Sequence, residues 1–205
     1  MDTKPHTAVV IACGAIMVFI SMGTRQSFGL FLQPITLDLS VGRETFSLAI
    51  ALQNLLFGLP LIGFLADRFG SRKIAMAGGL FYAASFLLLS ATNTPAGLYM
   101  NLGVMAGIAI GATSYVVVLG AVAKAVPPDK RSSRFGIITA AGSFGMFAVV
   151  PGVQWLIASA GWQTSFATLA AFVGITAILA IGYPGKASVA TSQSSPEEEI
   201  SQSLT

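Results

Sequence analysis

Long apolar stretches separated by short polar segments dominate the chain from residue 8 to residue 183. A helix that crosses the hydrocarbon core of a bilayer needs about 20 mostly apolar residues. The stretches that meet this requirement are residues 8–32, 46–65, 74–91, 95–123, 135–158 and 165–183. They lack the period-2 alternation of barrel strands, and in lipid a lone segment must bond its own backbone polar groups. The pattern therefore predicts an all-α membrane protein with six transmembrane helices.

Short segments rich in Pro, Gly, Ser, Thr and Asn separate these stretches, at residues 40–42, 92–95, 127–129 and 160–162. Such residues favour turns and helix caps. Residues 1–7 then form a short N-terminal segment, and residues 8–183 form one transmembrane domain. Residues 184–205 are rich in Ser, Thr and Gln and include three consecutive Glu residues, so they are predicted to be a disordered tail.

Lys and Arg residues are distributed very unequally between the two sides of the predicted membrane domain. One side carries Lys4, Arg68, Arg72, Lys73, Lys124, Lys130, Arg131, Arg134 and Lys186, and the other side carries Arg43 alone. Basic residues in short loops favour the cytoplasmic side. The distribution predicts a multi-pass protein of the plasma (inner) membrane with both termini in the cytoplasm.

The composition excludes several other classes of protein. Charged residues make up 9% of the chain, whereas a soluble domain carries about 25%. The basic residues are too scattered for a nucleic-acid interface. One cysteine, Cys13, and one histidine, His6, leave no metal-ligand cluster and no base for a serine nucleophile. We expect a lipid-embedded protein that is not an enzyme and holds no metal or cofactor.

Arg25 is the only ionisable residue inside a predicted span. A charge in a membrane helix is costly and marks a functional site by default. Arg25 shares a helical face with Ser21 and Gly29, and its guanidinium can bind a carboxylate with two hydrogen bonds. A structural interpretation is equally open, in which Arg25 snorkels to the interface or bonds a helix carbonyl.

Two further polar residues, Asn54 and Ser143, are candidate contacts for the same solute. Polar residues in spans more often hydrogen-bond between helices, so these two are weaker candidates than Arg25. Because a guanidinium binds carboxylates, the sequence predicts a small organic anion as solute, with Arg25 as the main contact and Asn54 and Ser143 as additional contacts.

The segment GFLADRFGSRK, residues 63–73, resembles the signature loop of the major facilitator superfamily, G-x-L-A-D-R-x-G-R-K. The residues that match are Gly63, Leu65, Ala66, Asp67, Arg68, Gly70, Arg72 and Lys73. The segments GTRQSFGLFLQPI (residues 23–35), SLAIALQNLLFGLPLIG (47–63) and GWQTSF (161–166) are similar to the oxalate:formate and monocarboxylate transporter branch, with Gln163 in place of a usual Arg.

This resemblance implies the N-terminal half of a major facilitator fold, a 3+3 inverted repeat, in a secondary transporter that works by alternating access. It implies a monocarboxylate-like solute, with a proton as a candidate coupling ion. By resemblance, Gly63, Asp67, Arg68, Gly70, Arg72 and Lys73 form a cytoplasmic gate.

The family has twelve helices, so we expect a second six-helix half or a homodimer to complete the transporter, and we favour a truncated transporter. The alternative is a non-transporting remnant or interaction subunit that pairs with another half.

Overall fold

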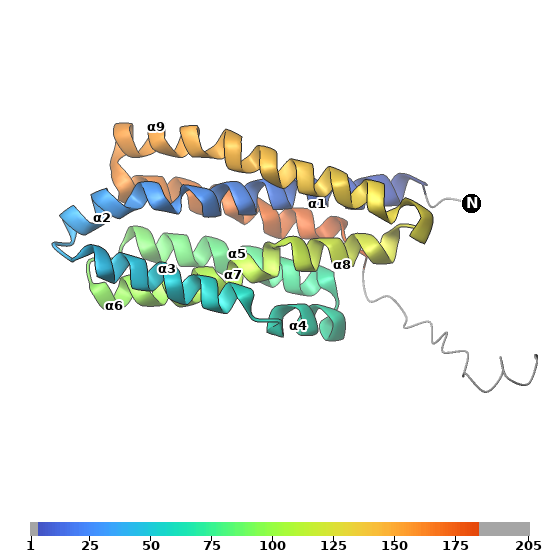
Figure 1. Cartoon of the computed structure of the whole chain (residues 1–205), viewed down its shortest axis with the longest axis horizontal. Helices are drawn as coiled ribbons and strands as arrows, with labels where there is room; N and C mark the ends of the chain where they lie inside the picture. Colours follow the sequence, from blue (N-terminus) through green and yellow to red (C-terminus); the bar gives the residue numbers. More distant parts are fainter. Residues whose placement is uncertain (1–3, 185–205) are drawn as a thin grey trace, which may run out of the picture.

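The computed structural model describes residues 4–184, and the predicted tail from residue 185 onward lies outside this part. The described residues form helices and no strands, and the helices run along the longest axis of the molecule (Figure 1). The elements are α1 (Lys4–Gln26), η1 (Ser27–Phe31), α2 (Leu32–Asp38), α3 (Arg43–Gly58), α4 (Leu61–Phe69), α5 (Ser71–Ser90), α6 (Pro95–Leu98), the π-helical η2 (Tyr99–Met105), α7 (Ala106–Thr113), α8 (Tyr115–Ala125), η3 (Pro128–Lys130), α9 (Arg131–Leu179) and η4 (Ala180–Gly182).

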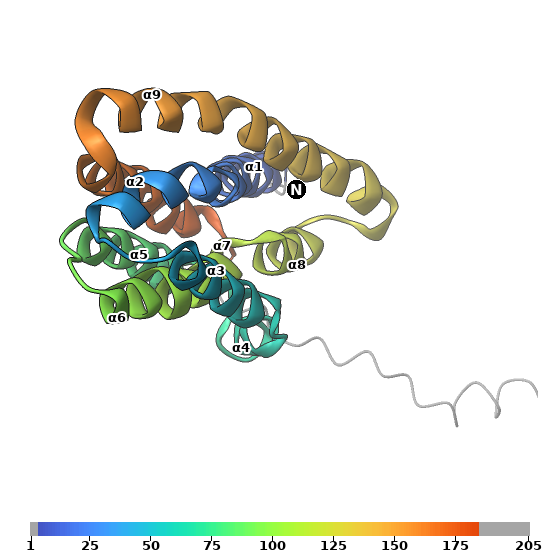
Figure 2. The same ribbon diagram turned by 60° about the vertical axis from the view of Figure 1, so that its left-hand side comes forward.

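Four helical stretches within residues 4–184 are long and apolar enough to cross a membrane: Thr7–Asp38, Ser71–Ser90, Pro95–Ala125 and Pro128–Gly182. The pair α3 and α4, bent by 43°, makes a fifth if it is counted as one span. The last stretch has 55 residues, more than twice the about 20 that one crossing requires. At Gly161 its backbone leaves the helical region, with φ 78° and ψ 171°. The chain reverses its direction there, so α9 contains two segments that run in opposite directions (Figure 2).

Two predicted spans are interrupted by extended residues. The segment 46–65 breaks at Leu59, with ψ 132°, directly before Pro60. A proline disfavours the α conformation of the residue before it and lacks an N–H donor, which explains this break. The segment 95–123 breaks at Ser114, with ψ −179°. The Ser114 hydroxyl donates to the Gly111 carbonyl at 2.9 Å, and such a local bond competes with the helical ladder.

Close contacts between small residues hold the helices together. A Cβ atom on Gly23 of α1 would lie 2.6 Å from the Gly145 carbonyl of α9. A Cβ atom on Gly107 of α7 would lie 2.9 Å from the Gln53 carbonyl of α3. Backbones that approach this closely are typical of helix packing in membranes.

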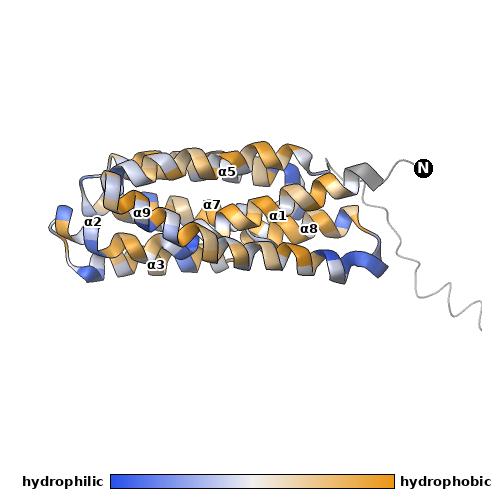
Figure 3. Cartoon of the chain, turned by 90° about the horizontal axis from the view of Figure 1, so that it is seen from above, coloured by the Kyte–Doolittle hydropathy of each residue, from blue (hydrophilic) through white to orange (hydrophobic). Residues whose placement is uncertain are grey.

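Apolar residues predominate along the helices, and hydrophilic residues gather at the two ends of the bundle (Figure 3). The core contains a cluster of aromatic rings, in which Phe86 packs against Phe28 and Phe166 with ring centroids 5.9 and 5.2 Å apart. Phe166 also stacks on Phe31 at 4.1 Å. This cluster fixes the end of α1 and η1 against α5 and α9, and so positions the face of α1 that is described next.

Candidate functional site

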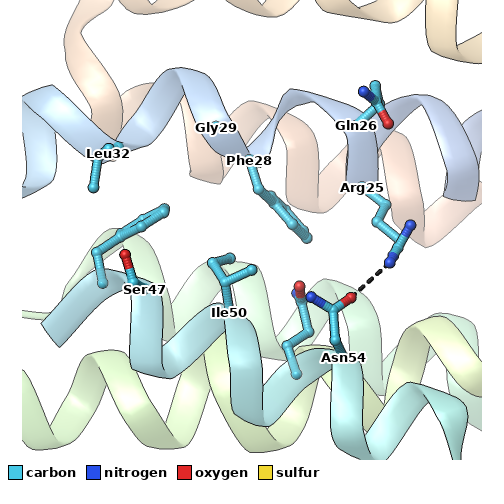
Figure 4. A pocket seen from close by; sticks show the side chains of 10 residues that line it. Arg25, Gln26, Phe28, Gly29, Leu32, Ser47, Ile50 and Asn54 are labelled. Atoms are coloured by element: carbon cyan, nitrogen blue, oxygen red, sulfur yellow. Dashed lines mark hydrogen bonds between the residues drawn. The ribbon is translucent and has the colours of Figure 1, made fainter. Parts of the chain in front are cut away.

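A pocket of about 340 Å³ lies between α1–η1–α2 and α3 (Figure 4). Its lining residues are Arg25, Gln26, Phe28, Gly29, Leu32, Phe46, Ser47, Ile50, Gln53 and Asn54. All of them belong to two neighbouring helical segments. Most of the polar lining residues gather around Arg25 at one end of the pocket, and the other walls are mostly apolar.

Arg25 and Asn54, two of the predicted solute contacts, meet in this pocket. Nη2 of Arg25 donates to Oδ1 of Asn54 at 2.6 Å, and Figure 4 shows the two side chains pointing toward each other from α1 and α3. The guanidinium also lies over the Phe57 ring, with Cζ 4.8 Å from the ring centroid. An amide oxygen and an aromatic face stabilise a cation only partly.

Arg25 lacks a carboxylate partner within the described residues. The ion pair found there joins Lys124 to Asp67 and involves a different end of the bundle. A guanidinium in an apolar helix bundle is stabilised by an anion or by water. The positive charge of Arg25 is thus available to an anionic ligand that enters the pocket.

Arg25 lies near the middle of the bundle, and the rest of the pocket extends from it toward the Asp38 end. The first spanning stretch runs from Thr7 to Asp38, which extends beyond the predicted end of this span at residue 32. Arg25 is therefore slightly closer to the Asp38 end of this span than to the Thr7 end. Its partner Asn54 lies in the second half of α3. Solute sites of secondary transporters lie near the bilayer midplane, so this position suits a transport site.

Two hydrogen-bond donors at the pocket lack an acceptor. Nε of Arg25 and Nε2 of Gln53 are buried without a hydrogen-bond partner among residues 4–184, and Gln53 is only 1% exposed. A buried donor left unpaired costs about 1–3 kcal/mol. An acceptor such as a carboxylate oxygen would satisfy either group if it reached this depth, which makes Gln53 an additional candidate contact. Its signal in the sequence is a second amide beside Asn54 within an apolar span.

Within the part of the chain that the structure describes, the buried hydroxyls of Thr24 and Tyr82 beside this region also lack partners. Tyr82 packs edge-on against Phe86, with ring centroids 4.8 Å apart, and Phe86 packs against the pocket residue Phe28. The span 74–91 reads as uniformly apolar in the sequence, so nothing there distinguishes Tyr82 from a packing residue.

Ser143, the third predicted solute contact, lies elsewhere. It is exposed on α9 and is not among the residues that line the pocket. One turn before Arg25 on α1, Ser21 makes a polar contact with Thr113 of α7. Their hydroxyl oxygens are 2.9 Å apart and buried. The structure thus brings Arg25 and Asn54 together and leaves Ser143 outside the group.

The residues of segment 63–73 lie at the end of α4 and the start of α5. Asp67 accepts from Nζ of Lys124, at the end of α8, at 3.1 Å, and their side chains are 77% and 37% exposed. Gly70 has φ 94° and joins the two helices. Arg68 lies over the Phe69 ring at 5.6 Å, whereas Arg72 is half-buried and Lys73 is exposed. Gly63 lies within α4.

A second polar contact joins two turns at the opposite end of the bundle. The Asp38 carboxylate accepts from Nε1 of Trp162 at 3.0 Å and from Nε2 of Gln163 at 2.9 Å. Trp162 is 4% exposed. This contact fastens the end of α2 to the reversal at Gly161.

Residue Asn101, in the π-helical turn, has a structural set of partners. Its Nδ2 donates to the Thr92 hydroxyl at 2.8 Å, and its backbone carbonyl accepts from the Ser85 hydroxyl at 2.8 Å.

Among residues 4–184, no group of three or more His, Cys, Asp or Glu side chains could hold a metal ion.

Comparison with known proteins gives one family. The family model described as Major Facilitator Superfamily matches residues 14–205. Human monocarboxylate transporter 7 is 26% identical over 174 residues, which cover 82% of this chain and 31% of the relative. Monocarboxylate transporter 13 of Rattus norvegicus is 27% identical, covering 69% of this chain and 33% of the relative. The uncharacterized MFS-type transporter YhjX of Escherichia coli (strain K12) is 28% identical, covering 65% and 33%. The chain spans about a third of the length of these curated relatives.

Proposed function

Because this chain belongs to the Major Facilitator Superfamily, we propose that it is the solute-binding part of a secondary transporter that carries a small monocarboxylate by alternating access. Its six apolar segments cross the plasma (inner) membrane, with both termini in the cytoplasm and a proton as candidate coupling ion. Relatives named monocarboxylate transporter support this solute class.

The observation that carries the proposal is the state of Arg25. Its guanidinium lies near the middle of the bundle, bonded to one amide oxygen and to no carboxylate of residues 4–184. A carboxylate that enters the pocket would accept from Arg25 and from Nε2 of Gln53, which has no partner in the structure. A small apolar substituent would then contact Phe28 and Ile50 on the pocket walls.

The proposed gate lies at the Asp67 end of the bundle. The ion pair between Asp67 and Lys124 is well exposed, and exposed pairs contribute about 0–1 kcal/mol. A contact this weak can be broken and remade in each transport cycle. We propose that Asp67 and the basic residues Arg68, Arg72 and Lys73, with Gly63 and Gly70 shaping the turn, form the cytoplasmic gate against a second six-helix half or a second copy of the chain.

Uptake into proteoliposomes tests the proposal. The purified chain is reconstituted and offered a panel of short radiolabelled monocarboxylates, a dicarboxylate and a neutral sugar. We expect uptake of a monocarboxylate by the wild type and by the control Arg43→Gln, which removes an exposed arginine outside the pocket. The variant Arg25→Gln loses a charged hydrogen-bond donor, so its apparent affinity falls about 10- to 100-fold.

Three results decide between the candidates. Undiminished uptake by Arg25→Gln contradicts the role of Arg25. Uptake of the neutral sugar instead of any carboxylate contradicts the solute class. Folded protein that transports nothing, and that co-purifies with another membrane protein, supports the alternative in which the chain is an interaction subunit.

A further inference from the structure

A second groove lies at the end of the bundle where α1 begins, far along α1 from the Arg25 pocket. Its volume is about 730 Å³, about twice that of the Arg25 pocket. It is formed by the first turns of α1, the loop at Val126 and Pro127, and the start of α9. The hydroxyl of Thr7 donates to the Ala125 carbonyl at 3.2 Å, so α1 begins beside the end of α8.

The floor of this groove is apolar and follows α1. Ala8, Ala12 and Ala15 line it together with Ile11, and their spacing places them on one helical face. The distance from Ala8 to Ala15 along the helix is about 10 Å. Small side chains on this face leave room beside the helix, and Ile137 of α9, 44% exposed, borders the opposite side.

Two cations border the same groove. Lys130 and Arg134 line it from η3 and the first turn of α9, and their four-residue spacing places them on one side of the chain. Neither side chain makes a hydrogen bond or an ion pair with any residue in the part of the chain that the structure describes. Nearby Arg131 differs, since its Nε donates to the Val126 carbonyl at 3.2 Å. The groove thus combines a long apolar floor with two unpaired positive charges at its end.

We propose that this groove binds one anionic phospholipid, with the phosphate between Lys130 and Arg134 and one acyl chain along Ala8, Ala12 and Ala15. Basic pockets between membrane helices bind anionic lipid headgroups in this manner. Lys130 and Arg134 lie where α9 begins, and hydrophilic residues gather at the ends of the bundle (Figure 3). The apolar floor extends from there along α1 toward the apolar middle of the bundle. This site is separate from the proposed transport site and does not depend on which solute is carried.

Lipid binding to the purified full-length chain tests the proposal. The protein is stripped of lipid in detergent and titrated with dioleoyl phosphatidylglycerol or with dioleoyl phosphatidylcholine, and bound lipid is counted by native mass spectrometry. We expect one tightly bound phosphatidylglycerol and weaker binding of phosphatidylcholine. Each basic residue near a membrane surface strengthens anionic lipid binding about fivefold. The double variant K130Q/R134Q should therefore bind phosphatidylglycerol about 25-fold more weakly.

Matched variants distinguish the groove from general attraction of charge. Arg43→Gln also removes one cation but leaves the groove intact, so its lipid binding should equal that of the wild type. Ala12→Phe fills the apolar floor and should weaken binding of both lipids while the charges remain. Inorganic phosphate at millimolar concentration should not compete, because it lacks the acyl chain.

Four results would overturn the proposal: equal lipid binding by K130Q/R134Q and the wild type, no effect of Ala12→Phe in a variant that remains monodisperse, full competition by inorganic phosphate, or a second copy of the chain bound in place of lipid.

Discussion

Replacing Arg25 with leucine separates the two interpretations of this residue, because they predict opposite changes in stability. A structural arginine holds helices together, and its loss lowers the free energy of unfolding. A binding arginine is retained for its ligand at a cost to the empty protein. The contacts of Arg25 allow the balance to be worked out.

The unfavourable contributions are larger than the favourable ones. An arginine near the centre of a membrane helix costs about 2.5–3.5 kcal/mol, and its buried, unpaired Nε adds about 1–3 kcal/mol. Against this, the bond to Asn54 contributes about 1.5–3 kcal/mol. The contact with the Phe57 ring contributes about 0.5–2 kcal/mol. We expect Arg25→Leu to stabilise the empty protein by about 1–2 kcal/mol, which raises the Tm by about 2–8 °C.

The assay is thermal unfolding of the purified protein in detergent, with and without the transported carboxylate. A ligand at 100 times its Kd stabilises the folded state by about 2.7 kcal/mol. We expect this ligand-dependent rise in Tm for the wild type and for the control Arg43→Leu, and not for Arg25→Leu. If Arg25→Leu lowers the Tm by several degrees and still responds to the carboxylate, Arg25 is a structural anchor and the reasoning is wrong.

Three further predictions concern packing and polar contacts. Gly145→Ala places a Cβ atom 2.8 Å from Cα of Phe19 in α1, so we expect the free energy of unfolding to fall by about 1–3 kcal/mol. The control Gly152→Ala on the same helix meets nothing within 4 Å and should be neutral or slightly stabilising in the same thermal assay. Asp38→Ala leaves the buried indole N–H of Trp162 without its acceptor and should lower the free energy of unfolding by about 1–3 kcal/mol. In a double-mutant cycle, Asp38→Ala should cost much less in a Trp162→Phe background, and additive effects of the two mutations would contradict the role of the bond. Lys124→Ala removes an exposed ion pair and should change the free energy of unfolding by less than about 1 kcal/mol, so a larger loss would show that the pair is a structural clamp.

The helices themselves follow from the apolar stretches of the sequence, since most residues of each predicted span are helical in the structure. The breaks inside them follow less directly. Pro60 is visible in the sequence, and the extended Leu59 before it is the conformation that a proline favours. Ser114 has no such signal, because a serine in an apolar helix more often remains helical, and only the surrounding protein makes the extended residue tolerable.

The candidate site could be predicted only in part. Arg25 stands out in the sequence because it is the one charge in a span, and charge is scarce there. Its contact with Asn54 depends on where α1 and α3 are held by their other neighbours, α1 by the contact of Gly23 with Gly145 of α9 and α3 by the contact of Gln53 with Gly107 of α7. Ser143 has the same polarity as a solute contact, but the register of α9 leaves it outside the pocket. Polarity within a span marks candidates, and helix packing selects among them.

The position of the Arg25 pocket also bears on what completes the transporter. Every residue that lines it comes from two neighbouring segments, 25–32 and 46–54. Alternating access requires a site that is closed from each side in turn by two bodies that rock against each other. Two adjacent helices form one wall only, so the proposed mechanism needs a second wall from other segments. The curated relatives have about three times the length that the chain matches. We therefore expect a cysteine placed at the exposed Asn54, in a Cys13→Ser background, to crosslink to a second copy or to a second half in the membrane. A cysteine at the exposed Leu80 of α5 should not, and equal crosslinking at both positions would contradict a specific second wall.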